Sequence, residues 1–544
     1  MRHSGDRRAR SRLLGAALGV LLAGGTAGAQ IPGSGGTPEQ RAIAAILQDS
    51  SPRIPGEEHP LPLAASWNGG RMPLGFSPDW QVEQIRDGRY LLPWFELEMP
   101  PADPVREGYS TVGDALYFRS AIRYLARNHL PLSFVTTTWE RLLPRVSAAY
   151  PTDAQGNPLP LSPFGPIAPW YQVGRAWAQD PSLRMLQAIY PDPPLVLFVS
   201  DNESPKVTPD NAKVAPGTDG SPQAITRRRA IGNDWIARYR SMIQGFRDGL
   251  QAPGWRAHSV FIGYDAFVTP AMGRWQDWAG DSLHVPGRTE PWPYAWEGAS
   301  VSYYVHNWAP DSDSIVWSPQ IEAMNDVPVL SEVRRTEPDF WFELSTWDGQ
   351  EPDQPTDKLL YYAAHGQKLT PARYGGMVQF GMWLLRPRVV REFRNWTDQR
   401  LRFEPYFDRI TDAVARIHRD PVLRNFWRRG RLVANPAGGH PYETALPPEL
   451  ASRPRWFLLD SPANPPRPWQ LTTPLAVYPL ALVRGRAPHR EWLVYAFSPL
   501  QRSMDVPVRI PGGPRVIVRA ARGGAFTRIR EGTPLPVARE VVGN

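Results

Sequence analysis

Residues Leu195–Glu203 read LVLFVSDNE, a short apolar run that ends in polar and acidic side chains. Apolar runs of about four to eight residues bounded by polar residues are typical of buried strands. Seven further runs share this layout, at 61–68, 90–98, 132–140, 259–266, 300–308, 339–347 and 377–384. Helices are predicted between several of them, at 111–128, 229–250, 356–364 and 388–395. This alternation predicts a parallel sheet covered by helices.

The number of strand–helix units decides between two α/β folds. Eight units over residues 61–425 predict a (β/α)8 TIM barrel with insertions as the catalytic domain. The alternative is an open doubly wound sheet. It would be favoured by a glycine-rich phosphate loop after an early strand, which the sequence lacks.

The character of the sequence changes after about residue 425. Helical periodicity gives way to short β runs at 456–459, 475–482, 491–498, 505–510 and 515–520. Pro511-Gly512-Gly513 and Gly523-Gly524 have the composition of turns. Residues 426–544 are therefore predicted to form a C-terminal all-β sandwich domain.

The N-terminus has the three parts of a secretory signal. Several arginines precede the apolar run Leu13–Ala23, and Ala27-Gly28-Ala29 supplies a small-x-small cleavage pattern. Residues 1–29 are predicted to be a signal peptide, with 30–60 as a leader or linker, and an uncleaved anchor is the alternative. The apolar run is shorter than the roughly 20 residues of a permanent membrane anchor. We expect a periplasmic or extracellular protein.

Composition excludes several kinds of chemistry. The 544 residues include no Cys, which rules out thiolate catalysis and Cys-ligated metals. No His-Glu-x-x-His or Gly-x-Ser-x-Gly pattern is present, and no cofactor or metal is predicted. The net charge of +8 is scattered, so nucleic acid is not an expected partner. The charge gives a weak indication of an anionic glycan, and the oligomeric state is left open.

Tryptophan is unusually frequent, with 22 residues. Many belong to the core, but three stand beside polar residues where predicted strands end, namely Trp67, Trp139 and Trp347. Flat aromatic faces stack on sugar rings, so these three are candidate substrate-binding residues.

Two carboxylates end or interrupt apolar strands. Glu203 follows Asn202 after the run at 195–200, and Glu343 lies within the aromatic run Phe340–Glu343. Polar residues at the carboxyl ends of barrel strands face the active site. Glycoside hydrolysis needs two opposed carboxyl groups, one to protonate the leaving oxygen and one to attack or to activate water. Glu98, Glu140 and Glu297 are rival carboxylates.

This arrangement resembles the clan A glycoside hydrolases, retaining enzymes on (β/α)8 barrels. The resemblance covers roughly residues 61–400, although Ser-Asp-Asn-Glu-Ser-Pro replaces the commoner Asn-Glu-Pro, and it identifies no individual family. It implies that Glu203 is the acid/base and Glu343 the nucleophile. It also implies that Asn202 contacts the sugar 2-hydroxyl, with Tyr304 or His306 near the nucleophile. Trp383 would be a sugar platform at the end of the eighth strand.

The predicted function is that of a secreted glycoside hydrolase that cleaves a polysaccharide or oligosaccharide with retention. Two alternatives remain. One is an exported carbohydrate-binding barrel without catalysis, and the other is a polysaccharide lyase. Sugar, linkage and endo or exo attack are not determined by the sequence.

Overall fold

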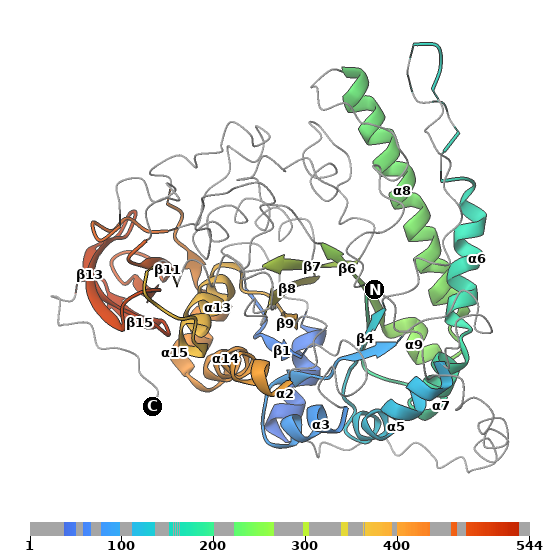
Figure 1. The fold of residues 1–544 in the computed structure, drawn as a ribbon, viewed down its shortest axis with the longest axis horizontal. Coiled ribbons are helices and arrows are strands. Elements are labelled where there is room, and N and C mark those ends of the chain that lie inside the picture. The colour runs from blue at the N-terminus through green and yellow to red at the C-terminus, as the bar shows by residue number, and fades with distance from the viewer. Residues whose placement is uncertain are drawn as a thin grey trace.

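The computed structural model describes the protein in segments (Figure 1). The described residues are 37–49, 58–66, 78–97, 111–136, 152–200 except 156, 158, 160 and 163, 222–265, 297–303, 339–345, 363, 365–393, 400–435, 458–464 and 475–532. The predicted signal peptide and the predicted helix at 356–364, apart from residue 363, lie outside them. In the described part, no helix is both long enough and apolar enough to span a membrane.

A nine-stranded parallel sheet forms the first half of the fold. Its order is β2-β1-β9-β8-β7-β6-β5-β4-β3. The strands are β1 (Leu63–Ala65), β2 (Leu91–Leu92), β3 (Phe95–Leu97), β4 (Leu132–Thr136), β5 (Val196–Ser200), β6 (Ser259–Asp265), β7 (Gly298–Tyr303), β8 (Asp339–Ser345) and β9 (Val389–Phe393). The first seven predicted apolar runs coincide with β1 to β8, because these runs are short and rich in β-branched or aromatic residues. The run at 90–98 contains both β2 and β3, and β7 begins two residues before the run at 300–308.

The two ends of this sheet are adjacent in sequence. β2 pairs with β1, β3 pairs with β4, and only Pro93 and Trp94 separate β2 from β3. The side chain of Gln81 takes the place of a strand partner at this interruption. Its Oε1 accepts a hydrogen bond from the Trp94 amide at 2.7 Å, and its Nε2 donates to the Trp94 carbonyl at 3.0 Å. Both groups are buried, so the contact satisfies polar atoms that the ladder leaves open.

Helices lie between the strands in sequence. They are α2 (Pro38–Gln48), α3 (Pro78–Arg86), α5 (Thr111–Arg127), α6 (Ile167–Ala178), α7 (Pro181–Ile189), α8 (Pro222–Gly249), α9 (Pro253–His258), α13 (Pro371–Leu385), α14 (Arg400–Arg419) and α15 (Pro421–Arg429). Figure 1 shows α6 and α8 side by side, projecting beyond the sheet, and the two helices are in contact. The helices at 111–128 and 229–250 are confirmed.

The eighth predicted unit is wrong. Residues 377–384 belong to helix α13, and the predicted helix at 388–395 contains strand β9. In α13, every residue from Arg373 to Leu385 is buried. A helix that is buried all round has no polar stripe, so its sequence looks like an apolar strand.

A second, mainly antiparallel sheet follows α15. It comprises β10 (Arg431–Leu432), β11 (Tyr478–Arg484), β12 (Glu491–Phe497), β13 (Ser503–Arg509), β14 (Arg515–Ala521) and β15 (Ala525–Arg530). The order is β10-β11-β12-β14-β13, with β15 also paired to β12. A separate core unites alternate residues of these strands, for example Val494, Val506 and Val518.

Strand β12 joins this second core to the rest of the molecule. Trp492, Val494 and Ala496 belong to the second core, whereas Leu493, Tyr495 and Phe497 belong to the large core that includes α13. The Tyr495 hydroxyl donates to the Gly376 carbonyl of α13. Because side chains alternate across a strand, one strand serves both cores. Helix α13 is buried all round because it lies between the two sheets.

Candidate functional site

The carboxyl ends of the parallel strands form one edge of the first sheet. β5 ends at Ser200, immediately before Asp201, Asn202 and Glu203. Glu343 lies within β8, where its backbone is in register with Ser302 of β7 and Arg391 of β9. In parallel α/β sheets this edge is where ligands bind. In sequence, Glu203 therefore follows the carboxyl end of one strand of this sheet, and the Glu343 backbone lies within another.

Arg391 is a buried charged residue at this edge that the sequence analysis missed. Its side chain is 0% exposed, and its guanidinium lies 5.1 Å from the centre of the Trp94 ring. A cation over an indole face is favourable, and more so when both are desolvated. Sequence could have found it, because Val389-Val390 after Pro387 is a β-forming pattern.

The face of β9 on which Arg391 lies can be compared with that of the next residue, Glu392. Burial, and then the carboxylate of Glu392, raise the pKa of Tyr374 on α13. Successive strand residues point to opposite faces. Arg391 therefore lies on the face of β9 opposite to Glu392, the face shared with Val389.

Most of the predicted site residues lie outside the described part of the chain. These are Asn202, Glu203, Tyr304, His306, Trp67, Trp139 and Trp347, and of Glu343 only the backbone is described. Each of the seven follows the end of a strand closely: Ala65 for Trp67, Thr136 for Trp139, Ser200 for Asn202 and Glu203, Tyr303 for Tyr304 and His306, and Ser345 for Trp347. The rivals Glu98 and Glu140 also lie outside.

The expectation for Trp383 is wrong. Trp383 lies in α13 rather than at a strand end, and it is 1% exposed. Its ring packs edge-on against Trp427 at 5.2 Å and Phe526 at 5.1 Å. A ring enclosed in this way has no face for a sugar, so Trp383 is a core residue between the two sheets.

The rival Glu297 lies at the opposite edge of the sheet. It immediately precedes β7, its Oε1 accepts from Arg247 at 2.6 Å, and its Oε2 accepts from the Phe261 amide at 3.0 Å. Both oxygens are thereby held by structural partners. Glu297 thus connects α8 to β6 and is a structural residue, not a catalytic candidate.

The described residues offer no metal site. Among them, no three His, Asp or Glu side chains converge in a way that could hold a metal ion. Arg391 is instead a buried cation, and it contacts the ring of Trp94, which is buried as well.

No protein family profile and no curated protein matches the sequence. Among solved structures, the chain is similar to a modular endo-β-1,4-mannanase of glycoside hydrolase family 26 from Cellulomonas fimi. The TM-score is 0.35 at 9% identity, over 89% of this chain and 97% of that one. It is also similar to a maltogenic α-amylase from Thermotoga neapolitana, with TM-score 0.26 at 8% identity, over 80% of this chain and 96% of that one. Likenesses of this size assign the chain to no family.

Proposed function

We propose that the protein is a glycoside hydrolase that cleaves a polysaccharide or oligosaccharide with retention, using Glu203 as acid/base and Glu343 as nucleophile. One observation carries the proposal: in sequence Glu203 follows the carboxyl end of β5 by three residues, and the backbone of Glu343 lies in β8 of the same parallel sheet, in register with the buried Arg391. Two carboxyl groups are what glycosidic bond cleavage needs.

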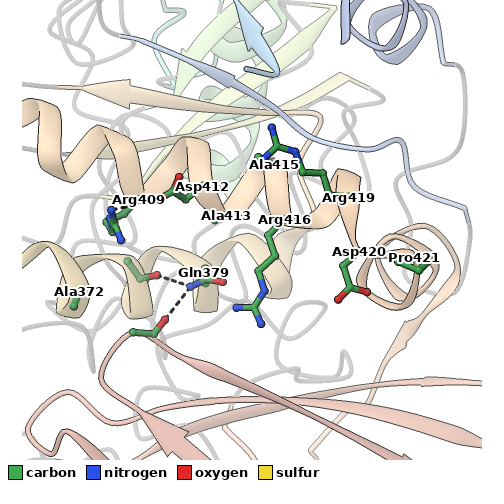
Figure 2. A pocket seen from close by; sticks show the side chains of 12 residues that line it. Ala372, Gln379, Arg409, Asp412, Ala413, Ala415, Arg416, Arg419, Asp420 and Pro421 are labelled. Atoms are coloured by element: carbon green, nitrogen blue, oxygen red, sulfur yellow. Dashed lines mark hydrogen bonds and ion pairs between the residues drawn. The ribbon is translucent and has the colours of Figure 1, made fainter. Parts of the chain in front are cut away.

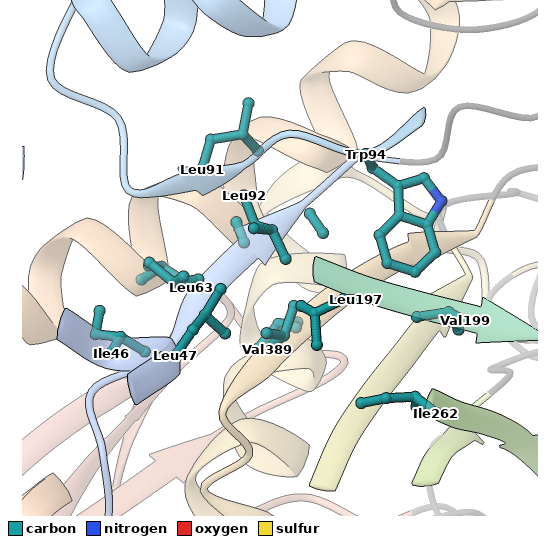
Figure 3. Packing of buried hydrophobic residues seen from close by; sticks show 14 of the residues in the cluster. Ile46, Leu47, Leu63, Leu91, Leu92, Trp94, Leu197, Val199, Ile262 and Val389 are labelled. Atoms are coloured by element: carbon teal, nitrogen blue, oxygen red, sulfur yellow. The ribbon is translucent and has the colours of Figure 1, made fainter. Parts of the chain in front are cut away.

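We infer that the parallel sheet is a (β/α)8 barrel. β2 and β3 are then two halves of the second strand, and the pairing runs from β1 round to β9 and back to β1. The packing supports this, because Leu197 and Val199 of β5 belong to one core with Val389 of β9, four places away in the sheet. Figure 3 shows these side chains and Trp94 directed into a common space. The all-β part would be an accessory sandwich.

Closure of the sheet matters for the chemistry. Neighbouring strands lie about 4.8 Å apart, so the three steps from β5 to β8 measure roughly 14 Å along the sheet. A retaining mechanism needs carboxyl groups about 5–5.5 Å apart. In a closed ring, side chains from the two strands would extend towards each other across the interior.

In this mechanism the two carboxyl groups begin in different protonation states. Glu343 attacks the anomeric carbon as a carboxylate, while Glu203 donates its proton to the leaving oxygen and later takes one from water. The backbones of Glu343 and Arg391 are in register on neighbouring strands. We propose that the Arg391 guanidinium would favour the ionised form of the nucleophile.

The proposal is tested with Glu203→Gln and Glu343→Gln on a panel of polymeric glycans. We expect each to lower hydrolysis by about 10²-fold or more while binding is retained. Glu297→Gln is the matched control, and it should keep its activity because Glu297 lies at the other edge. The anomeric configuration of the first product, followed by NMR, would establish retention or inversion.

Other outcomes would contradict the proposal. If the wild-type protein binds glycans but hydrolyses none, it is a carbohydrate-binding protein. If its products are unsaturated and absorb in the ultraviolet, it is a lyase.

We also propose that the protein works outside the cytoplasm, on the basis of its first 29 residues. Polymeric glycans are too large to enter a cell intact, so export and substrate agree. N-terminal sequencing of the native protein should begin at Gln30. An intact N-terminus would contradict cleavage.

A further inference from the structure

The outer face of the β13–β14 hairpin is an exposed surface with an excess of positive charge. Buried and exposed residues alternate along both strands, and the buried ones belong to the second core, so the others point to solvent. Figure 1 shows β13 at the outer margin of the molecule, on the side away from α13. The register places six exposed residues on this face in three cross-strand pairs: Asp505 with Arg519, Pro507 with Ile517, and Arg509 with Arg515.

Arg509 and Arg515 place like charges directly opposite each other. The Arg509 amide donates to the Asp460 carbonyl at 2.9 Å, away from β14, so the pair occupies a non-hydrogen-bonded position of the ladder. At such a position the two Cα atoms are only about 4.5 Å apart. Like charges directly opposite on two strands destabilise a sheet. Among the described residues, neither guanidinium forms an ion pair or a hydrogen bond.

The other end of the face carries a compensated charge. The Arg519 guanidinium lies 3.5 Å from the Asp505 carboxylate and donates to the Ser503 hydroxyl at 2.7 Å. The uncompensated positive charge of this face is therefore confined to Arg509 and Arg515.

The arginines around the cavity between α13, α14 and the β14–β15 turn differ from this pair (Figure 2). Arg409 lies 3.2 Å from Asp412, and Arg419 donates to the Gly88 carbonyl at 3.4 Å. Figure 2 shows Arg416 and Arg419 directed to opposite sides. Those charges are engaged within the fold and do not meet at one point, whereas Arg509 and Arg515 are adjacent and exposed.

An aliphatic centre lies next to the arginine pair. Ile517 is 64% exposed, and its cross-strand partner is Pro507. Residues two apart on a strand share a face and are separated by about 7 Å, so Ile517 lies about 7 Å from Arg515 along β14. An exposed aliphatic side chain beside arginines is a composition found in protein–protein interfaces. None of the six residues of the face offers an aromatic ring on which a sugar could stack.

The edge of β13 is occupied, so a partner would lie on the face of the hairpin. The Pro507 carbonyl accepts from the Ser461 hydroxyl at 2.8 Å, and the Arg509 amide is bonded to Asp460. Pro507 also has no N–H with which to pair a further strand. Addition of a strand at this edge is therefore disfavoured.

We propose that this face docks an acidic segment of a partner protein, in which a carboxylate lies two residues from an aliphatic side chain. The carboxylate would lie between Arg509 and Arg515, where charge-assisted hydrogen bonds would offset their repulsion. The aliphatic side chain would contact Ile517, because an extended segment repeats its side chains on one face at the same spacing of about 7 Å. This docking does not depend on the proposed glycoside hydrolysis.

The test is panning of a displayed library of random twelve-residue peptides on the immobilised full chain. The Arg509→Gln/Arg515→Gln variant serves for counter-selection. We expect enrichment of peptides with Asp or Glu two positions from Leu, Ile or Val. In fluorescence anisotropy, a synthetic peptide of the enriched sequence should bind the double variant at least tenfold more weakly, and Ile517→Thr severalfold more weakly.

Two controls separate lost binding from lost folding. Arg486→Gln, at an exposed position in the β11–β12 turn, is the matched control and should bind the peptide like the wild type. The double variant should unfold at a urea midpoint no lower than that of the wild type, because two opposed like charges are removed.

Four results would overturn the proposal. The first is enrichment of peptides without acidic residues, or equal binding of the peptide to the double variant. The second is binding of inorganic phosphate as tight as that of the peptide, which would make the pair a small-anion site. The third is tighter binding of phosphatidylglycerol vesicles, which would assign the face to a membrane. The fourth is dimerisation that the double variant abolishes, which would make a second copy of this chain the occupant.

Discussion

At the scale of single residues, Gln81 completes the hydrogen bonding where the parallel sheet is interrupted. Its amide bonds both backbone polar groups of Trp94. Gln81→Ala would leave a buried N–H and a buried C=O without this partner, at about 1–3 kcal/mol for each group. We predict a loss of about 2–4 kcal/mol in the free energy of unfolding, measured by urea denaturation. Gln84→Ala, a partly exposed position of the same helix, should change it little; equal midpoints for the two variants would contradict this role.

His418 makes stability depend on pH. It is 5% exposed, its Nε2–H donates to the Pro62 carbonyl at 2.8 Å, and its ring stacks on Tyr90 at 3.7 Å. Burial lowers its pKa to about 4, from an ordinary value of 6.5. Between pH 6.5 and 4 the imidazole is therefore protonated in the unfolded chain but neutral in the folded one. The free energy of unfolding is highest above pH 6.5 and decreases as the pH falls towards 4.

The size of this effect can be measured. The shift corresponds to about 3 kcal/mol between the two ends of the window. His418→Gln should reduce the pH dependence of unfolding between pH 6.5 and 4. His489→Gln, at an exposed position, should leave it unchanged. Identical pH profiles for the wild type and His418→Gln would show that this histidine does not contribute.

At the scale of elements, α6 and α8 approach each other through glycines. A Cβ at Gly245 would lie 2.1 Å from the Tyr171 carbonyl oxygen, and one at Gly174 would lie 2.0 Å from the Met242 carbonyl oxygen. We predict that Gly245→Ala destabilises the protein by about 1–3 kcal/mol, because the helices must move apart. Thermal unfolding of the variant measures it. Gln244→Ala, the exposed neighbouring position, is the control; a stabilised Gly245→Ala would contradict the close packing.

At the scale of the whole molecule, α13 makes the two sheets depend on each other. Phe497 of β12 is fully buried, stacks on Tyr478 at 4.6 Å and contacts Phe380 of α13 at 6.2 Å between ring centres. We predict that Phe497→Ala costs about 3–5 kcal/mol and lowers a single calorimetric transition. Ile517→Ala, 64% exposed, should have little effect. Two separate transitions, with hydrogen exchange in β9 unchanged, would show that the sheets fold independently.

The sequence by itself determined the elements whose patterns are local. Seven apolar runs contain the parallel strands β1 to β8, because short β-branched and aromatic runs between polar residues favour that conformation. The place of Glu343 in a strand, and that of Glu203 just after one, follow from the same patterns.

Only the tertiary structure decided what depends on contacts between distant segments. Trp383 and its helix were mistaken for a strand, since burial between two sheets removed the polar stripe that marks a helix. Arg391 lies between the backbones of Ala65 and Glu343 only because β9 pairs in this register with β1 and β8. Sequence patterns predict secondary structure from residues that are close along the chain. The burial of a side chain and the clustering of charges depend instead on which distant segments the fold brings together.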